Sequence, residues 1–155
     1  MSKDVAVLGV GMHPWGKWGQ SFVGYGVKAA QDALKDAGVE WKDIQLVAGG
    51  DTIRNGYPGY VAGATFAQAL GWSGAKVSSS YGACATGAQA ISVARAHILA
   101  GLCEVALVVG ADAAPKGFFA PAGGHRPAFD CRWLCNQQHA GRYHAEKAGR
   151  FDHRG

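Results

Sequence analysis

The sequence predicts an α/β fold with a mostly parallel sheet flanked by helices. Short apolar runs alternate with longer segments of helical periodicity, and many of the 24 glycines stand at the ends of these elements. Strands that are joined through helices pair in parallel and are covered by those helices. With 155 residues, of which 48% are hydrophobic, the chain is long enough for one domain with a packed core.

The first half of the pattern contains two strands and one helix. Asp4–Gly11 is a short apolar run closed by glycines, which predicts a buried strand. Apolar residues recur at helical spacing over 22–37, with Ser21 as a suitable N-cap and Gly38 as a suitable C-cap. The apolar run Ile44–Gly49 predicts the second strand.

The second half completes the order β-α-β-α-β-α-β. We expect a helix over Tyr57–Leu70, although two internal glycines reduce its stability, and a short strand over Lys76–Ser80. A long helix is expected over Cys84–Ala100. Val105–Gly110 is the clearest strand, because it is apolar and rich in β-branched residues.

The composition changes near the C-terminus. Residues 126–155 contain one Leu and no Val or Ile, but five Arg, three His and two Cys. Such a segment buries too little aliphatic surface to offset its ordering entropy. We therefore expect an incomplete α/β domain over 1–124 and an atypical basic tail over 125–155. The tail is either naturally disordered or the product of a shifted reading frame that ends a longer protein early, and we favour the second reading.

Charge and apolar patterning exclude several classes of protein. The net charge is +4, but residues 1–125 are almost neutral, so a nucleic-acid role would rest on the tail alone. No apolar run reaches the length of a membrane span, and the N-terminus does not resemble a signal peptide. We therefore expect a cytoplasmic protein whose four cysteines are reduced thiols.

Cys84 is the candidate nucleophile. It follows a predicted strand and begins a predicted helix, where unpaired backbone N–H groups and the helix dipole favour a thiolate. The thiolate is the reactive form of cysteine, and the small residues that follow leave room for a substrate. The alternative is a small buried residue that packs the helix against the sheet.

The chain resembles the N-terminal part of the thiolase superfamily over about Asp4 to Gly124. The resemblance is closest to the sterol-carrier or lipid-transfer type of thiolase-like protein. The segments that carry it are Val5–Gly11, Asp36-Ala37-Gly38, Ala83-Cys84-Ala85-Thr86-Gly87, and Val105–Gly110 followed by Ala111-Asp112.

The resemblance implies a thiolase-like half-domain that transfers acyl groups in fatty-acid or sterol side-chain metabolism. Cys84 would accept the acyl group from an acyl-CoA or 3-ketoacyl-CoA thioester, which is the substrate, and no cofactor or metal is implied. It also implies a homodimer paired through the strand Lys76–Ser80.

The family's histidines and second cysteine lie in the other half of its fold. Gly124-His125-Arg126-Pro127 is only superficially similar to the family's Gly-His-Pro signature. Cysteine alone lacks the groups that transfer protons, so we expect an incomplete catalyst.

Two further readings of the resemblance stay open. The chain could be the subunit of a steroid side-chain aldolase that needs a small OB-fold or zinc-ribbon partner, in which Cys84 matters less. It could also be a non-catalytic fragment that binds lipid or another subunit. Replacing Cys84 by Ala separates the enzymatic readings, because it abolishes thiolysis but not retro-aldol cleavage.

Other motifs have more ordinary interpretations. Gly9-Val10-Gly11 lacks the third glycine of a dinucleotide fingerprint. Cys131, Cys135, His139 and His144 are zinc-ligand types, but their spacing is too short for a finger, so random tail composition is favoured.

The loop after the first predicted strand is aromatic. His13, Trp15 and Trp18 could line an acyl or sterol pocket, although plain packing is the favoured reading. Asp112 could orient the active-site loop or could be an ordinary turn residue at a strand end, and these alternatives are equal. His97 and Cys103 are expected to be structural.

Overall fold

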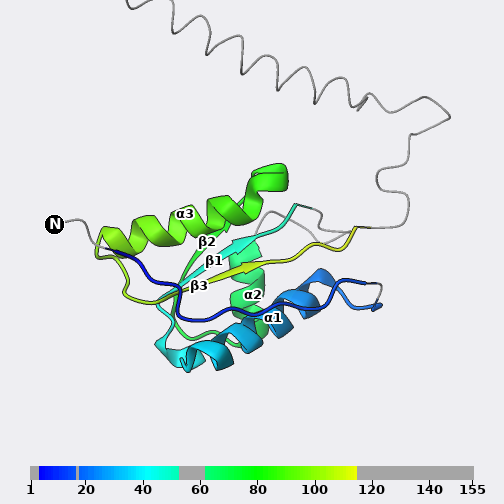
Figure 1. The fold of residues 1–155 in the computed structure, drawn as a ribbon, viewed down its shortest axis with the longest axis horizontal. Helices are drawn as coiled ribbons and strands as arrows, with labels where there is room; N and C mark the ends of the chain where they lie inside the picture. Colours follow the sequence, from blue (N-terminus) through cyan, green and yellow to red (C-terminus); the bar gives the residue numbers. More distant parts are fainter. Residues whose placement is uncertain (1–3, 17, 53–61, 115–155) are drawn as a thin grey trace, which may run out of the picture. The chain divides into compact units, whose positions relative to one another are not determined.

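The structure is a computed structural model in which residues 4–16, 18–52 and 62–114 are described (Figure 1). Its centre is a parallel sheet with the strand order β2-β1-β3. The strands are β1 (Leu46–Gly50), β2 (Lys76–Ser80) and β3 (Ala106–Gly110). Leu46 lies opposite both Lys76 and Ala106, so the first residues of the three strands are in register, as are the last.

Helices cover both faces of the sheet. Figure 1 shows α3 (Thr86–Leu99) on one face and α1 (Phe22–Ala37) with α2 (Ala62–Leu70) on the other. Two short 3₁₀ turns, η1 (Trp41–Asp43) and η2 (Ala83–Ala85), precede β1 and α3 respectively. The described part of the chain is therefore a three-layer α/β unit, which confirms the predicted fold class.

The alternation of side chains along β1 divides the core in two. Val47 packs toward α1 and α2 in a cluster that includes Phe22 and Phe66. Leu46 and Ala48 point to the opposite face and pack against α3. Successive strand residues face opposite sides, so an unbroken apolar strand needs helices on both sides.

Several predicted element ends are confirmed. The Ser21 hydroxyl accepts a hydrogen bond from Gly24 N–H at 3.3 Å, and Gly38 ends α1 with a left-handed φ of 66°. Strand β2 has the predicted bounds. These signals are local, since a cap depends on residues within one turn of it.

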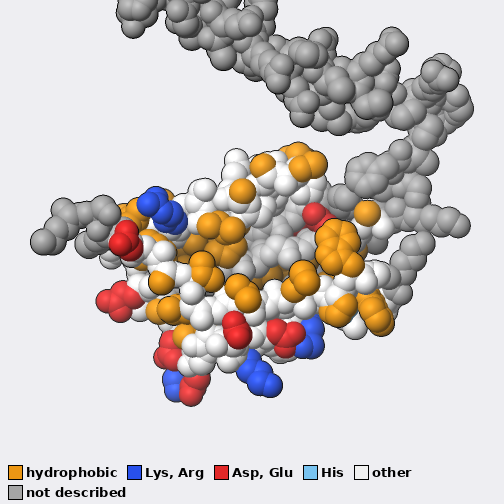
Figure 2. All heavy atoms as spheres, viewed as in Figure 1, with side chains coloured by type: hydrophobic (Ala, Val, Ile, Leu, Met, Phe, Trp, Pro, Cys, Tyr) orange, Lys and Arg blue, Asp and Glu red, His pale blue; other side chains and the backbone are white. Residues whose placement is uncertain are grey.

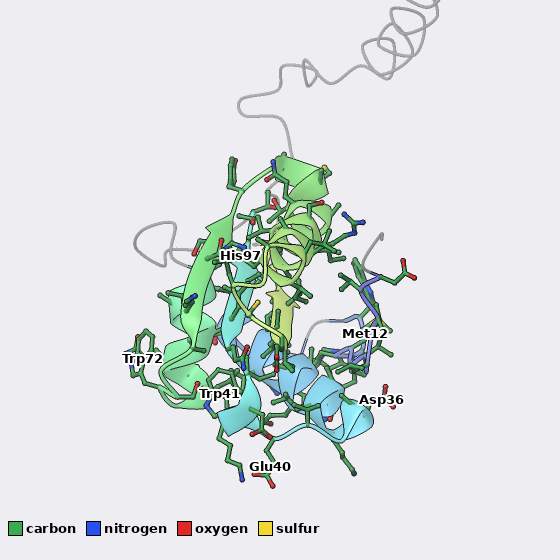
Figure 3. All side chains as sticks on the ribbon, turned by 90° about the vertical axis from the view of Figure 1, so that its left-hand side faces the viewer. Met12, Asp36, Glu40, Trp41, Trp72 and His97 are labelled. Carbon is green, nitrogen blue, oxygen red and sulfur yellow. The ribbon has the colours of Figure 1, made fainter. Side chains whose placement is uncertain are left out.

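The prediction of a buried strand at Asp4–Gly11 is wrong. This segment forms no described strand and runs along α1, on the same side as Met12 and Asp36 in Figure 3. Val10 N–H donates to Asp36 Oδ2 at 2.9 Å, and a Cβ on Gly11 would lie 2.2 Å from the Ala29 carbonyl oxygen. The glycines allow contact with a helix backbone, and no described strand pairs with the segment.

The surface of this part of the chain is mixed. In Figure 2, charged side chains gather at the lower edge, where Figure 1 places α1 and η1, while hydrophobic side chains lie above them. Val7 in the N-terminal segment is 83% exposed. No described helix combines the length and hydropathy needed to cross a bilayer.

Two helix boundaries differ from the prediction. The described part of the second helix begins at Ala62, and residues 53–61 lie outside the described residues. The third helix begins at Thr86 instead of Cys84, because the chain first makes the turn η2. The predicted tail, 125–155, also lies outside the described residues.

Candidate active site

Cys84 lies in η2, between the end of β2 and the start of α3, and it is exposed. The strands of a parallel sheet present their carboxyl ends at one edge, which is where α/β proteins bind ligands. The structure therefore places the predicted nucleophile at the appropriate edge, on the turn before the helix.

The turn around Cys84 contains a strained residue. Ala83 has a φ of 48°, and no other described non-glycine residue has a positive φ. The left-handed region costs an L-residue other than glycine about 1–2 kcal/mol. Surrounding contacts must therefore hold Ala83 in this conformation.

Three donors converge on the carbonyl oxygen of Ala83. The Thr86 hydroxyl donates to it at 2.7 Å, the Thr52 hydroxyl donates at 2.9 Å, and the Thr86 N–H also points to it. The Thr86 hydroxyl in turn accepts from Gly82 N–H at 2.9 Å and lies 3.1 Å from the Thr52 hydroxyl. These contacts hold the strained peptide in place.

Thr52 also connects the carboxyl ends of the other two strands. It follows β1, and its N–H donates to Asp112 Oδ1, just beyond β3, at 2.6 Å. Asp112 therefore links the end of β3 to the residue after β1, which is compatible with both of its predicted roles. The ends of β1, β2 and β3 are thus linked in a single network around Cys84.

Close packing supports this network. A Cβ on Gly50 would lie 2.6 Å from Thr86 Cγ2, so only glycine allows Thr86 to approach the end of β1 this closely. Thr86 itself is buried, with 6% of its surface exposed. The position of α3 on the sheet therefore depends on this glycine.

The other described cysteine has a different environment. Cys103 is buried against α3, in the cluster that contains Leu46. Burial raises the pKa of its thiol, while the Lys76 ammonium acts in the opposite direction to a lesser extent. Its predicted structural role fits this position, because a buried neutral thiol is a poor nucleophile.

The contacts of the two described histidines are with residues other than Cys84. His97 bonds to Val93 O at 2.9 Å and lies eleven residues after Thr86 on α3, about 16 Å along the helix axis. His13 stacks edge-on against Tyr25, with ring centroids 4.6 Å apart. The hydrogen bonds of the described residues thus join no imidazole to the Cys84 thiol.

The aromatic loop packs on itself and on α1. Trp18 Nε1 donates to Pro14 O at 3.0 Å, and Trp15 is 91% exposed. The contacts of His13 and Trp18 agree with plain packing, the favoured interpretation of this loop, whereas the exposed Trp15 side chain does not.

A shallow cavity lies at the opposite edge of the sheet. Lys42, Gln45, Lys76 and Leu102 contribute to its lining. Lys76 is the first residue of β2, and the other three precede the strands to which they connect. Because Cys84 follows its strand, this cavity is not part of the candidate site.

The loop after α2 is bonded to η1. Trp41 Nε1 donates a hydrogen bond to Gly71 O, on the same side as Trp72 in Figure 3.

No group of residues in the described ranges is arranged to hold a metal ion. The residues considered for zinc, Cys131, Cys135, His139 and His144, lie outside those ranges.

Thr52 and Thr86 are the site residues that sequence reasoning missed. The role of Thr86 could have been predicted from the sequence, since threonine at the start of a helix often bonds to the preceding turn. The role of Thr52 could not, because its hydrogen-bond partners are 31 to 60 residues away along the chain.

Comparison with known proteins indicates the family and the fold of the chain. Residues 7–120 match the family described as beta-ketoacyl synthase, N-terminal domain. No curated protein matches the sequence. The crystal structure of 3-oxoacyl-[acyl-carrier-protein] synthase III from Aquifex aeolicus VF5 is similar to this chain, with a TM-score of 0.54 and 21% identity.

The structural match covers 61% of this chain and 30% of that protein, so the chain spans under a third of its length. The likeness confirms the thiolase-like half-domain fold. The predicted resemblance is thus confirmed at the level of the thiolase-like superfamily. Its narrower form, the sterol-carrier or lipid-transfer type, stays a prediction.

Proposed function

Because the chain belongs to the beta-ketoacyl synthase family, we propose that it carries the acyl-accepting site of a condensing enzyme, with Cys84 as the nucleophile. The observation that carries the proposal is the position of Cys84. It lies inside the matched region, exposed, at the carboxyl edge of the sheet and on a turn held by the side chains of Thr52 and Thr86.

The proposed step is a transfer between two thiols. The Cys84 thiol loses its proton, and Sγ forms a bond to the carbonyl carbon of an acyl thioester. The carbon–sulfur bond of the donor then breaks, and the released thiolate takes up a proton. One thioester is broken and one is formed, so the step needs no oxidant, reductant or metal.

We propose a coenzyme A thioester as the acyl donor, as expected from the sequence. The name of the similar synthase points to a second donor class, an acyl chain on an acyl carrier protein. Both donors present the same thioester chemistry. A fatty-acyl or sterol side-chain thioester would fit this donor class.

The described residues supply a nucleophile, but none of the hydrogen bonds described around its turn brings an imidazole, the most frequent proton-transfer group, to it. Condensation after acylation needs such groups, together with donors that stabilise the developing oxyanion. We therefore assign the acyl-transfer half reaction to this chain and propose that it is an incomplete catalyst of the full reaction.

We further propose a cytoplasmic homodimer paired through β2. This strand is at one edge of the described sheet, and most of its residues are exposed. An exposed edge strand offers unpaired backbone groups to a second copy. A small OB-fold partner would belong to the alternative function, a steroid side-chain aldolase subunit, which no described contact favours.

A transfer assay tests the proposal. The full chain is incubated with a radiolabelled fatty-acyl-CoA, or with the same acyl group on a carrier protein, and protein-bound label is measured after denaturation. We expect label that is released by neutral hydroxylamine and is absent from Cys84→Ala. Cys103→Ala is the matched control and should keep the label. Absence of label from both donors, or its persistence in Cys84→Ala, would overturn the proposal.

A further inference from the structure

The main chain of Cys84 is anchored on both sides. Before it, the Ala83 carbonyl oxygen accepts from the hydroxyls of Thr86 and Thr52. After it, the Ala85 N–H donates to Gly82 O at 2.9 Å. Because a peptide unit is planar, fixing the Ala83 carbonyl also fixes the nitrogen of Cys84, and fixing the Ala85 N–H fixes its carbonyl carbon.

Thr86 is central to this arrangement. Its hydroxyl donates to Ala83 O and accepts from Gly82 N–H, so one buried side chain holds residues on both sides of the strained peptide. Its methyl group is fixed against Gly50. The side chain therefore has little freedom to leave this position.

We propose that Thr86 is a positioning residue for the Cys84 nucleophile, with Thr52 in a supporting role. The inference rests on the proposed function, since the reaction it concerns is acyl transfer to Cys84. Neither threonine touches the thiol in the described contacts. They act through the peptide of Ala83, which would otherwise relax from its positive φ.

Loss of the Thr86 hydroxyl should affect the position of the Cys84 sulfur more than the stability of the fold. Acyl transfer needs the sulfur to approach the carbonyl carbon along a narrow range of directions, and a displacement of about 1 Å can lower such a rate about 100-fold. Alkylation by a small reagent in excess depends less on the direction from which the sulfur approaches. The ratio of the acylation rate to the alkylation rate at Cys84 therefore measures how well the sulfur is positioned.

The test compares three variants of the full chain. Thr86→Val keeps the shape but removes the hydroxyl, Thr86→Ser keeps the hydroxyl, and Thr65→Val changes another buried threonine on α2 as the matched control. For each variant we measure Cys84 acylation by an acyl thioester, Cys84 alkylation by iodoacetamide, and hydrogen exchange of the Gly82 amide.

We expect Thr86→Val to lower the ratio of acylation to alkylation at least about tenfold and to speed exchange at Gly82. Thr86→Ser and Thr65→Val should stay within about twofold of the unchanged chain for this ratio, since they disturb neither the Ala83 nor the Gly82 bond. An unchanged ratio in Thr86→Val, or an equal loss in Thr65→Val, would overturn the inference.

Failure of the proposed function gives a different result. In that case the unchanged chain is not acylated at all, although Cys84 is alkylated. Hydrogen exchange at the Gly82 amide then decides whether Thr86 holds the turn. Faster exchange in Thr86→Val, but not in Thr86→Ser or Thr65→Val, upholds this role, and any other pattern overturns it.

Discussion

At the scale of single residues, two thiols in one domain have opposite environments. Cys84 is exposed on a strained turn, whereas Cys103 is 5% exposed beneath α3. The difference follows from where each cysteine stands in the chain. Cys84 follows β2 at the carboxyl edge of the sheet, whereas Cys103 lies in the loop between α3 and β3 and its side chain is part of the core.

The buried thiol makes stability depend on pH. Burial raises the pKa of Cys103 above the ordinary value of 9.0, and the Lys76 ammonium opposes this only in part. Above about pH 9 the unfolded chain loses this proton first, so the free energy of unfolding falls as pH rises; below that value the contribution is constant. Urea titrations from about pH 7 to pH 10 check this.

Two variants isolate this contribution. Cys103→Ala and Cys103→Val lack the titrating group and differ in volume, so packing changes shift their stability but both should show a shallower decline above about pH 9. A decline as steep as that of the unchanged chain in both variants would rule out Cys103 as its source.

At the scale of elements, one contact between α3 and β1 is especially close, that of the Thr86 side chain with Gly50. A Cβ on Gly50 would meet Thr86 Cγ2 at 2.6 Å but would otherwise make only ordinary contacts with Thr86. We therefore expect Gly50→Ala to lower the free energy of unfolding by about 1–3 kcal/mol, since overpacking forces the helix away.

A second substitution relieves this clash. Serine lacks Cγ2, so Gly50→Ala in the Thr86→Ser background should cost clearly less than in the unchanged chain. Denaturant titration of the four chains measures the coupling. Equal costs of Gly50→Ala in both backgrounds would show that the Thr86 methyl is not what excludes a side chain at Gly50.

The elements also show which features the sequence could predict. The bounds of the helix 22–37 and of the strand Lys76–Ser80 were predicted closely, the helix from its local caps and apolar periodicity. The segment Asp4–Gly11 was assigned wrongly, because a strand exists only with a partner, and pairing is decided far along the chain. The turn η2 was missed because distant Thr52 helps to hold Ala83 in its strained conformation.

For the candidate site, the nucleophile was predictable and its support was not. Cys84 stands at a strand–helix junction that the residue pattern marks plainly. The bonds that hold its turn join residues from the ends of three strands, and no periodicity or motif indicates which of them meet. Tertiary contacts of this kind require the structure.

At the scale of the whole molecule, the β2 edge makes the proposed dimer testable. Val77 is 43% exposed on this strand. Sedimentation at micromolar concentration should give a dimer for the unchanged chain and a monomer for Val77→Lys, since charged residues on an edge oppose strand pairing.

The control lies away from the sheet. Val7→Lys changes a more exposed valine in the N-terminal segment and should remain dimeric. A monomeric unchanged chain, or a dimer that survives Val77→Lys, would contradict pairing through β2.

The central claim is that Cys84 accepts an acyl group, and mapping the adduct tests it most directly. The full chain is treated with an acyl thioester, digested at acidic pH to preserve the thioester, and its cysteine peptides are sequenced by tandem mass spectrometry. The account predicts the acyl mass on Cys84 and not on Cys103. Acyl groups only on other residues, or none on a Cys84 that iodoacetamide still alkylates, would contradict it.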